Sequence, residues 1–508
     1  MEKPSLEIGN SNWAIKEGEL LGYNRAGNDY LPIPITMTRA SLGTRVNPES
    51  LVEDVALLGV EEVEDGNFPT PNTEWAFIGT TEISGGTANF PDSTNSFLIQ
   101  ENIIDLSVKR YKLTYNVVST NGNNFRLAGG NSAFVGTFGV VTLDSATVGV
   151  KTVYLISNGT KRNLQFNNHN FIGSIDNVSL KEVTIDNLAR VDYTDGTSSL
   201  LVEPQRTNLI TYSSDFTQWD KNSGTNITLD SLISPDGTQN ADLIVASGSG
   251  SRVGDNVSIV SGNTYTLSVY LKNNGGNTSI TIGSYTTTQL ATITINDEWN
   301  RYTTTFVASS TTTSSIRIIS SGSNINLYAW GAQLEEGSYP TSYIPTSGLT
   351  VTRVQETYEK TGISNLINSE EGVLFLEMAA FSESNLNSYI TIGQNTSNGI
   401  LGISFYTGSN NILLDHWEGA SETYHIESIS DVTEFNKIAI CYDGTSIKGY
   451  INGSPVWNTT VTAWSSNALS ELNFAFGNSG TNKFLGKVKQ LQIFKTALKD
   501  EQLKTLTT

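Results

Sequence analysis

The sequence predicts an all-β fold of tandem antiparallel β-sandwiches. Apolar and polar residues alternate with a period of two in runs such as Tyr111–Val117 and Tyr265–Leu271, as half-buried strands require. Helix signals are scarce, and the best is Thr496–Leu506, for which we expect one short helix. At 508 residues the chain is too long for one core and fits three domains.

Composition and charge narrow the function classes. The chain is 16% charged, and its 45 glycines suit short strands joined by turns, while 20 Tyr, 19 Phe and 8 Trp can fill cores. Its formal charge of −20 repels phosphate backbones and anionic lipid surfaces, so we expect no nucleic-acid partner. No apolar stretch approaches 18 residues, so we expect no membrane insertion. The N-terminal residues lack the apolar core of a Sec-type signal, so we expect the protein to be made in a cytoplasm.

The chain has a single cysteine, Cys441, in the apolar run Lys437–Tyr442. It cannot form an internal disulfide. We expect it to be a small buried hydrophobic residue in a strand.

Two segments look like one module present twice. Tyr111 and Leu180 in the first copy lie as far apart as Tyr265 and Leu334 in the second, and similar residues surround each of them. Each copy also opens with a phenylalanine and a tryptophan close together: Phe68 with Trp75, and Phe216 with Trp219. Equal spacing of core-type residues predicts equal strand lengths and connections, and hence a duplicated β-sandwich.

A third unit starts near Glu370. Its segment Lys437–Val456 contains three alternating runs separated by the turns Asp443-Gly444 and Asn452-Gly453. Such dipeptides tolerate the positive φ of two-residue hairpin turns, so the unit is predicted to be an antiparallel sandwich.

Several motifs resemble parts of known families. The runs Thr38–Asn47, Leu51–Val55 and Ala189–Ile210 look like a linker signature of tailed-phage virion proteins. In those proteins the two halves of the signature often lie close together. Here the first copy separates them and looks inserted.

The modules also carry resemblances. The second copy, through Ser213–Trp219, Ser234–Ile244 and Trp330–Thr346, resembles the phage version of a carbohydrate-binding jelly roll. The first copy, ending in Phe171–Val183, resembles the broader carbohydrate-binding-module superfamily. The third unit is similar to laminin-G and concanavalin-like domains, as in Gln492–Leu498. The resemblances imply two jelly-roll modules plus one concanavalin/laminin-G-like sandwich.

The chain is therefore expected to have six parts. They are an N-terminal anchoring segment (1–58), an inserted jelly-roll module (60–184), a connector that completes the N-terminal region (185–212), a second jelly-roll module (213–346), a linker (347–365) and the concanavalin/laminin-G-like domain (366–508).

Four aromatic residues of the last domain are candidates for glycan binding: Trp417, Tyr424, Trp457 and Trp464. Pyranose C–H faces stack on aromatic rings, and we expect Trp417 and Trp464 to lie in loops. The alternative, that these rings belong to the core, stays open. For Trp219, Trp299 and Trp330 of the second module we expect core positions.

We expect no required cofactor. Carbohydrate-binding jelly rolls often hold a structural calcium ion, and this resemblance makes such an ion a candidate in the first copy. Asp176 matches the final-strand ligand of such sites, and Asp65 could supply the opposite side. In the second copy Trp330 occupies the matched position, so no metal is expected there.

Signals for catalysis are absent from the sequence. The three histidines are scattered, and neither an H-E-x-x-H nor a G-x-S-x-G motif occurs. Glycosidases on the concanavalin-like fold carry closely spaced carboxylates such as E-x-D-x-x-E, and the third unit has no such run. We therefore expect no enzyme and no catalytic residue.

Together these features predict a structural protein of a tailed-phage virion surface: a head fibre, capsid decoration or tail fibre that attaches weakly and multivalently to host or environmental glycans. Its partners would be other virion proteins, bound through the N-terminal region, and further copies in a homotrimer. The homotrimer is expected because residues 1–58 carry apolar side chains, among them Trp13, Leu20 and Ile33, that such a short segment cannot bury alone. The alternatives are a glycan-depolymerising enzyme and a bacterial or prophage adhesin.

Overall fold

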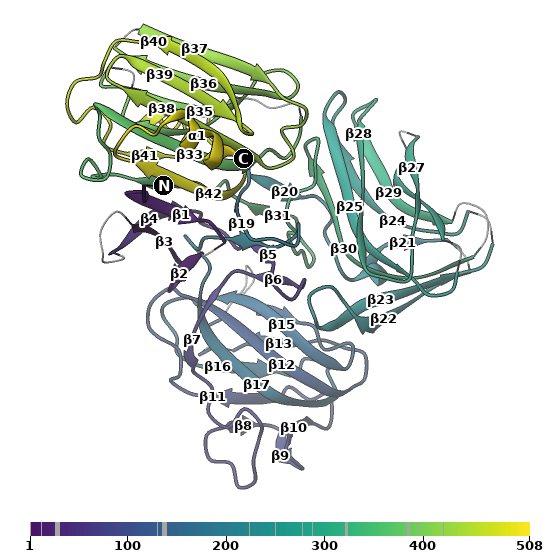
Figure 1. Ribbon diagram of the computed structural model, residues 1–508. Coiled ribbons are helices and arrows are strands. Elements are labelled where there is room, and N and C mark those ends of the chain that lie inside the picture. The colour runs from purple at the N-terminus through teal and green to yellow at the C-terminus, as the bar shows by residue number, and fades with distance from the viewer. Residues whose placement is uncertain are drawn as a thin grey trace. The chain divides into compact units, whose positions relative to one another are not determined.

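In the computed structural model, the regular secondary structure is almost entirely β-strand (Figure 1). It describes residues 2–11, 13–25, 31–129, 131–134, 140–222, 224–248, 250–276, 278–286, 288–320, 324–383, 387–395, 397–419 and 421–508. The chain divides into two compact units, one of Met1–Val55 with Asp186–Thr508 and one of Ala56–Ile185. The predicted insertion, 60–184, lies within the second unit. No helix in the described parts is long and apolar enough to cross a membrane.

Residues 56–185 form the first jelly-roll module, with two antiparallel sheets around one core. The first sheet has the order β15-β12-β17-β10-β9, with β7 also paired to β17, and the second has the order β14-β13-β16-β11-β8. The strands are β7 (Leu57–Glu61), β8 (Ala76–Ile78), β9 (Glu82–Ser84), β10 (Thr87–Phe90), β11 (Phe97–Gln100), β12 (Arg110–Thr120), β13 (Phe125–Ala128), β14 (Val140–Leu143), β15 (Gly149–Ile156), β16 (Leu164–Asn167) and β17 (Gly173–Thr184). The ring of Phe125 packs against those of Phe90, Phe166 and Phe171 at the centre of the core.

The second jelly-roll module lies in the other unit. Its sheets have the orders β28-β25-β30-β23-β22 and β27-β26-β29-β24-β21. Its elements are η1 (Phe216–Gln218), β21 (Asp220–Lys221), β22 (Thr225–Ile233), β23 (Gln239–Ala246), β24 (Arg252–Ile259), β25 (Thr264–Asn273), β26 (Ser279–Ser284), β27 (Gln289–Thr294), β28 (Asn300–Val307), β29 (Thr312–Ser320) and β30 (Ile325–Glu336).

The two modules share strand order and register. Leu113 pairs with Leu180 in the first module, and Leu267 pairs with Leu334 in the second. A bulge follows immediately in both, after Thr114 and after Ser268. The Phe and Trp that open each copy pack ring against ring, with centroids 5.3 Å and 4.8 Å apart. These shared features confirm the predicted duplication.

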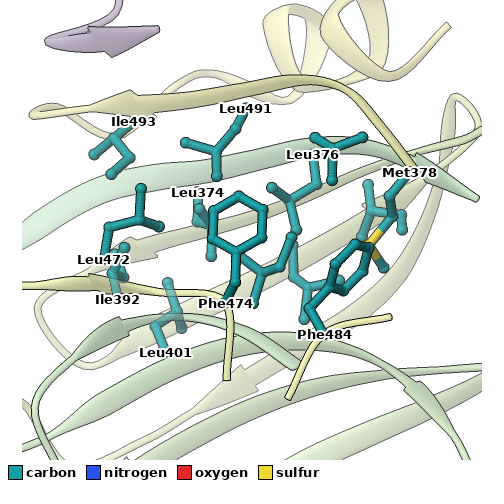
Figure 2. Close-up of a cluster of buried hydrophobic side chains, with 14 of the residues drawn as sticks. Leu374, Leu376, Met378, Ile392, Leu401, Leu472, Phe474, Phe484, Leu491 and Ile493 are labelled. Carbon is teal, nitrogen blue, oxygen red and sulfur yellow. The ribbon is translucent and has the colours of Figure 1, made fainter. Parts of the chain in front are cut away.

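The C-terminal sandwich packs two sheets face to face. One contains β40-β39-β38-β33-β42 and the other β37-β36-β35-β34-β41-β32. Its elements are β32 (Thr357–Lys360), β33 (Glu371–Ala379), β34 (Ser388–Gly393), β35 (Ile400–Tyr406), β36 (Asn411–Glu418), β37 (Ser421–Ser428), β38 (Asn436–Asp443), β39 (Ser446–Ile451), β40 (Ser454–Thr460), β41 (Leu472–Asn473), η2 (Gly477–Ser479), β42 (Gly486–Phe494) and α1 (Asp500–Thr507). Figure 2 shows side chains from β33, β34, β35, β41 and β42 meeting between the sheets.

The predicted terminal helix and buried cysteine are both confirmed. Helix α1 buries Leu503 in a small cluster on the outer side of β33 and β38. Cys441 lies in that cluster and is 4% exposed.

The N-terminal segment is part of the C-terminal sandwich. Strand β1 (Leu6–Gly9) pairs with β42, and β4 (Leu31–Thr38) pairs with β32, so the segment extends both sheets. Strands β2 (Ala14–Lys16) and β3 (Glu19–Asn24) link them, and from the connector β18 (Val191–Asp192) pairs with β19 (Ser199–Val202), which pairs with β42. Leu6, Leu20 and Ile35 lie fully buried in the sandwich core. The expectation that the apolar residues of 1–58 cannot be buried within one chain is therefore wrong.

A hairpin from the N-terminal region covers one face of the second jelly roll. Strands β5 (Thr44–Val46) and β6 (Val52–Asp54) pair with each other, and the Val52 N–H donates to the Pro235 carbonyl at 2.9 Å. Val52 packs in a cluster with Trp330 and Tyr343, whose rings lie 4.6 Å apart. Trp330 is buried as predicted, but it lies outside the jelly-roll interior.

Charged residues of the linker-like motifs form a buried ion network. Arg190 Nε lies 2.7 Å from Glu356 Oε1 and Arg190 Nη1 2.8 Å from Glu203 Oε2, while Arg39 also pairs with Glu356 and Arg353 with Glu203. All five side chains are at most 2% exposed. Burial opposes the charged form of Glu203, but Arg353 and Arg190 outweigh it and lower its pKa to about 2. The network joins four segments beside β20 (Arg206–Asn208) and β31 (Val351–Arg353).

Candidate functional site

The outer face of the second sheet of the C-terminal sandwich carries the candidate site. Side chains alternate between the two faces of β36. Ile412 and Leu414 point into the core, so Leu413, Asp415 and Trp417 lie on the outer face.

The strand register brings polar and aromatic groups together on this face. Asp415 is directly opposite Gly402 on β35 and Tyr424 on β37, and Trp417 is opposite Glu422. Directly opposed residues project from the same face of a sheet. A Cβ at Gly402 would lie 3.1 Å from the Thr391 methyl carbon, so the glycine leaves room for its neighbours' side chains.

Aromatic contacts and one hydrogen bond fix the Trp417 indole. Its Nε1 donates to Asp415 Oδ2 at 2.8 Å. The ring of Phe476 meets Trp417 edge-on with centroids 5.9 Å apart, and meets Tyr389 in the same way at 5.0 Å. Trp417 is half-buried and Tyr424 is 54% exposed, so both rings reach solvent. We call Tyr389, Asp415, Trp417, Tyr424 and Phe476 the outer-face cluster.

Asp415 is the buried acid of the outer-face cluster. Asp415 is 0% exposed, and burial raises the pKa of its carboxyl to about 7. The hydrogen bond from Trp417 acts in the opposite direction and lowers this pKa, but burial has the larger effect. Its Oδ1 has no hydrogen-bond partner among the described residues. A buried polar atom left in this way is a natural place for a water molecule or a ligand hydroxyl.

Of the four predicted candidates, the structure brings Trp417 and Tyr424 together. The prediction of a loop at Trp417 is wrong, because the residue lies within β36. For Trp457 and Trp464 the alternative that had been left open holds, because they are only 8% and 7% exposed and belong to the core. The Trp464 ring stacks on His416 at 4.3 Å, and burial lowers the pKa of that histidine to about 4.

The other members of the cluster were missed in the sequence. Tyr389, Asp415 and Phe476 come from three separate segments. The strand register places Tyr389 and Asp415 on one face, and ring contacts with Tyr389 and Trp417 add Phe476. The alternation of β36 carried a usable signal, since an acid two residues before a tryptophan places both on one side of a strand.

The two predicted calcium ligands lie in the first jelly-roll module. Asp65 is in a turn with φ 52°, where its backbone carbonyl accepts from the Trp75 indole at 3.2 Å. Asp176 is half-buried in β17, and its carboxylate accepts from the adjacent Asn177 N–H. Within the described ranges no three His, Cys, Asp or Glu residues gather closely enough to hold a metal ion. A calcium ion here stays a candidate and would need oxygen ligands beyond these two carboxylates.

Comparison with known proteins supports the domain content. A family model described as the concanavalin A-like lectin/glucanases superfamily, Laminin_G_3, matches residues 379–504, about a quarter of the chain. No curated protein sequence matches the chain significantly.

Several solved structures resemble parts of the chain. A leech intramolecular trans-sialidase is 17% identical over 27% of this chain and 23% of its own length, with a TM-score of 0.24. Domain 4 of AbnA, an extracellular arabinanase from Geobacillus stearothermophilus solved with arabinotriose, is 14% identical over 34% of this chain and 83% of its own, with a TM-score of 0.25. The tandem CBM22 domains of Paenibacillus barcinonensis Xyn10C are 10% identical over 56% of this chain and 98% of their own, with a TM-score of 0.20. The chain thus spans less than a quarter of the leech enzyme.

Proposed function

We propose that the protein is a non-enzymatic surface protein of a tailed-phage particle that binds host or environmental glycans weakly and multivalently. The observation that carries the glycan binding is the outer-face cluster, where two solvent-reaching rings lie beside a buried acid. Many weak sites on one particle can act together through avidity.

The chemistry of the cluster suits a saccharide. The rings of Trp417 and Tyr424 can stack on the apolar face of a pyranose. Asp415 acts as a positioning residue, because its hydrogen bond holds the indole in one orientation. Its unpartnered Oδ1 can exchange a hydrogen bond with a sugar hydroxyl that reaches it.

Substitution of the two rings tests this function. After a glycan screen identifies a ligand, Trp417→Ala and Tyr424→Ala should each weaken binding about tenfold, as loss of a stacked ring predicts. Trp417→Phe and Tyr424→Phe are the matched controls, since they keep a ring and should keep most of the affinity. Binding would be measured by NMR titration of the intact protein. Unchanged affinity in the double alanine variant would overturn the site.

Virion attachment through the N-terminal region and the homotrimer remain part of the proposal and rest on the motifs that resemble virion proteins. The mass of the intact chain, measured by light scattering, tests the trimer. A truncation would mislead, because Leu20 and its neighbours lie in the sandwich core.

Labelling of intact particles under the electron microscope tests the location, and finding the protein only on bacterial surfaces would favour the adhesin.

One observation favours the depolymerising enzyme as a second candidate. Glu422 lies next to the cluster, and burial raises its pKa as it does that of Asp415. Two such carboxyls could share acid–base work. Incubation with polysaccharide should release no reducing ends. Release that Glu422→Gln abolishes would establish the enzyme instead.

A further inference from the structure

A second surface with binding chemistry lies on the second jelly-roll module, far along the chain from the outer-face cluster of the C-terminal sandwich. It is the outer face of the sheet that contains β24, β29 and β26. Its notable residues are Arg252, Tyr285 and Arg317, which we call the arginine–tyrosine face.

Arg317 lies between two glycines on this face. In the strand register it lies opposite Gly254 on β24 and opposite Gly283 on β26. A Cβ at Gly254 would lie 2.8 Å from Arg317 Cγ, so a larger residue there would displace the arginine stem. Arg317 Nε also donates to Ser315 Oγ at 2.8 Å. The guanidinium is therefore held along the sheet surface.

Tyr285 completes a flat platform. The Arg317 guanidinium lies 3.7 Å from the centroid of the Tyr285 ring. The Tyr285 N–H donates to the Ser315 carbonyl at 2.9 Å, which fixes the turn beside β29. The tyrosine is nevertheless 50% exposed. One side of the ring is covered by the arginine, and the residue still reaches solvent.

The charge of this face is opposite to that of the chain. Among the described residues neither Arg252 nor Arg317 has a carboxylate within ion-pair distance. The nearby Asp220 accepts a hydrogen bond from Asn256 instead. Burial and then the charge of Arg252 lower the pKa of Arg317, as expected for two neighbouring cations. In a chain of net charge −20, two neighbouring arginines of which neither forms an ion pair among the described residues are unusual.

We propose that the arginine–tyrosine face binds a carboxylate-bearing saccharide, with Arg317 and Arg252 pairing with the carboxylate and Tyr285 contacting the pyranose. The planar guanidinium matches a carboxylate in two parallel hydrogen bonds. The Tyr285 ring beside the Arg317 guanidinium supplies an apolar contact. A sugar ring can use this contact, whereas a small inorganic anion cannot. The ligand class is thus an acidic glycan rather than a free anion.

Acidic and neutral forms of one sugar chain test the ligand class. The intact protein would be titrated, by calorimetry or NMR, with tetragalacturonate, with an oligomannuronate and with the methyl ester of tetragalacturonate. We expect at least one acidic oligosaccharide to bind and the uncharged ester to bind at least tenfold more weakly. Sodium sulfate at matched ionic strength should not compete specifically. Failure of both acidic oligosaccharides, equal binding of the ester, or full competition by sulfate would overturn the proposal.

Matched variants test the site. Arg317→Gln should weaken binding about tenfold, because the neutral glutamine amide cannot form the two charge-assisted hydrogen bonds with a carboxylate. Tyr285→Ala should also weaken it. Lys272→Gln on β25 removes one positive charge from the other sheet of the same module and should leave binding unchanged. The Trp417→Ala variant should also bind normally, so failure here is distinguishable from failure of the proposed function. Equal effects of Arg317→Gln and Lys272→Gln would sink the site.

Discussion

The two jelly-roll modules have one backbone plan and different surfaces. Their strands follow the same order, and the pairs Leu113–Leu180 and Leu267–Leu334 occupy equivalent places. After the bulge, Asn116 pairs with Asp176 in the first module, whereas Tyr270 pairs with Trp330 in the second. The paired leucines of the interior are the same in both modules, whereas this outward pair differs.

That divergence changes what the same face does. Trp330 in the second module packs against Tyr343 and Val52, so the face holds a hairpin of the chain itself. At the equivalent place in the first module, Asp176 is half-buried and accepts a hydrogen bond only from the next residue in β17 among the contacts observed. A single outward position thus separates a docking face from a polar one.

Among the point substitutions, exchange of the residue at this outward position, Trp330 or Asp176, should have the largest effect on the free energy of unfolding. Trp330→Asp removes a ring that is 2% exposed and leaves a buried carboxylate without a cation, so we expect a loss of at least about 4 kcal/mol in the free energy of unfolding. Asp176→Ala should cost less than about 0.5 kcal/mol. Urea unfolding gives the totals, and hydrogen exchange assigns each loss to its module. Similar losses for the two variants would contradict the comparison.

The two modules also differ at one buried position, where the first has an alanine and the second an aspartate. Ala88 pairs with Ile175 in the first module, and the equivalent pair in the second is Asp242 with Ala329. The Asp242 carboxylate accepts from the N–H groups of Phe216 at 2.8 Å and Asp230 at 3.1 Å. Asp242→Ala leaves both donors unpaired, and we expect it to cost about 2 kcal/mol by urea unfolding. A neutral outcome would mean that η1 is held by other contacts.

The same acid predicts a pH dependence. Burial raises the pKa of Asp242 to about 8, against its two backbone hydrogen bonds. Between about pH 4 and 8 the unfolded chain loses this proton and the folded chain keeps it, so the free energy of unfolding should fall as pH rises. Asp242→Asn should flatten this slope for the second module. The exposed Asp220→Asn is the control and should keep it, while an unchanged slope in Asp242→Asn would refute the assignment.

Removal of the whole first jelly-roll module should have a small effect on the stability of the remaining chain. The residues that flank it are bonded within the other unit, with the Val55 N–H donating to the Gly43 carbonyl at 2.8 Å and the Asn187 N–H to the Arg39 carbonyl at 2.7 Å. Joining Val55 to Asp186 should leave a folded remainder whose Tm is unchanged within about 2 °C. Removal of 213–346 should instead unfold it, because Ser342 bonds Glu203 and Trp330 covers Val52, and both of these remaining residues would lose their partners. Collapse after the first excision would argue against an inserted unit.

Local pattern explains what the sequence could predict. The strands of both jelly rolls, the buried Cys441 and helix α1 depend on alternation, apolar runs and short spacing that are visible in the chain. The pairing of β1 with β42 joins residues nearly 500 positions apart, and no local signal marks it. The same holds for the buried pairs of Glu356 with Arg39 and Arg190.

The candidate site was predictable only in part. Trp417 and Tyr424 stood out as aromatics in a polar stretch, but that polarity suggested a loop. The stretch around Trp417 is instead strand β36, in which the polar and aromatic residues of the outer face alternate with the buried Ile412 and Leu414. Trp464 does lie outside the strands, yet its ring enters the core, because backbone irregularity says little about where a large side chain is buried.

Calcium should have the smallest effect on the two modules. The ion requires six to eight oxygen ligands, and Asp65 and Asp176 alone supply too few carboxylates among the described residues. Addition of millimolar CaCl₂ to protein treated with EDTA should therefore shift the Tm of the first module by less than about 2 °C, and Asp176→Asn should leave that small shift unchanged. The second module, with Trp330 at the matched place, serves as the internal control. A shift of several degrees confined to the first module and lost in Asp176→Asn would show that Asp176 is a calcium ligand and that backbone oxygens complete its site.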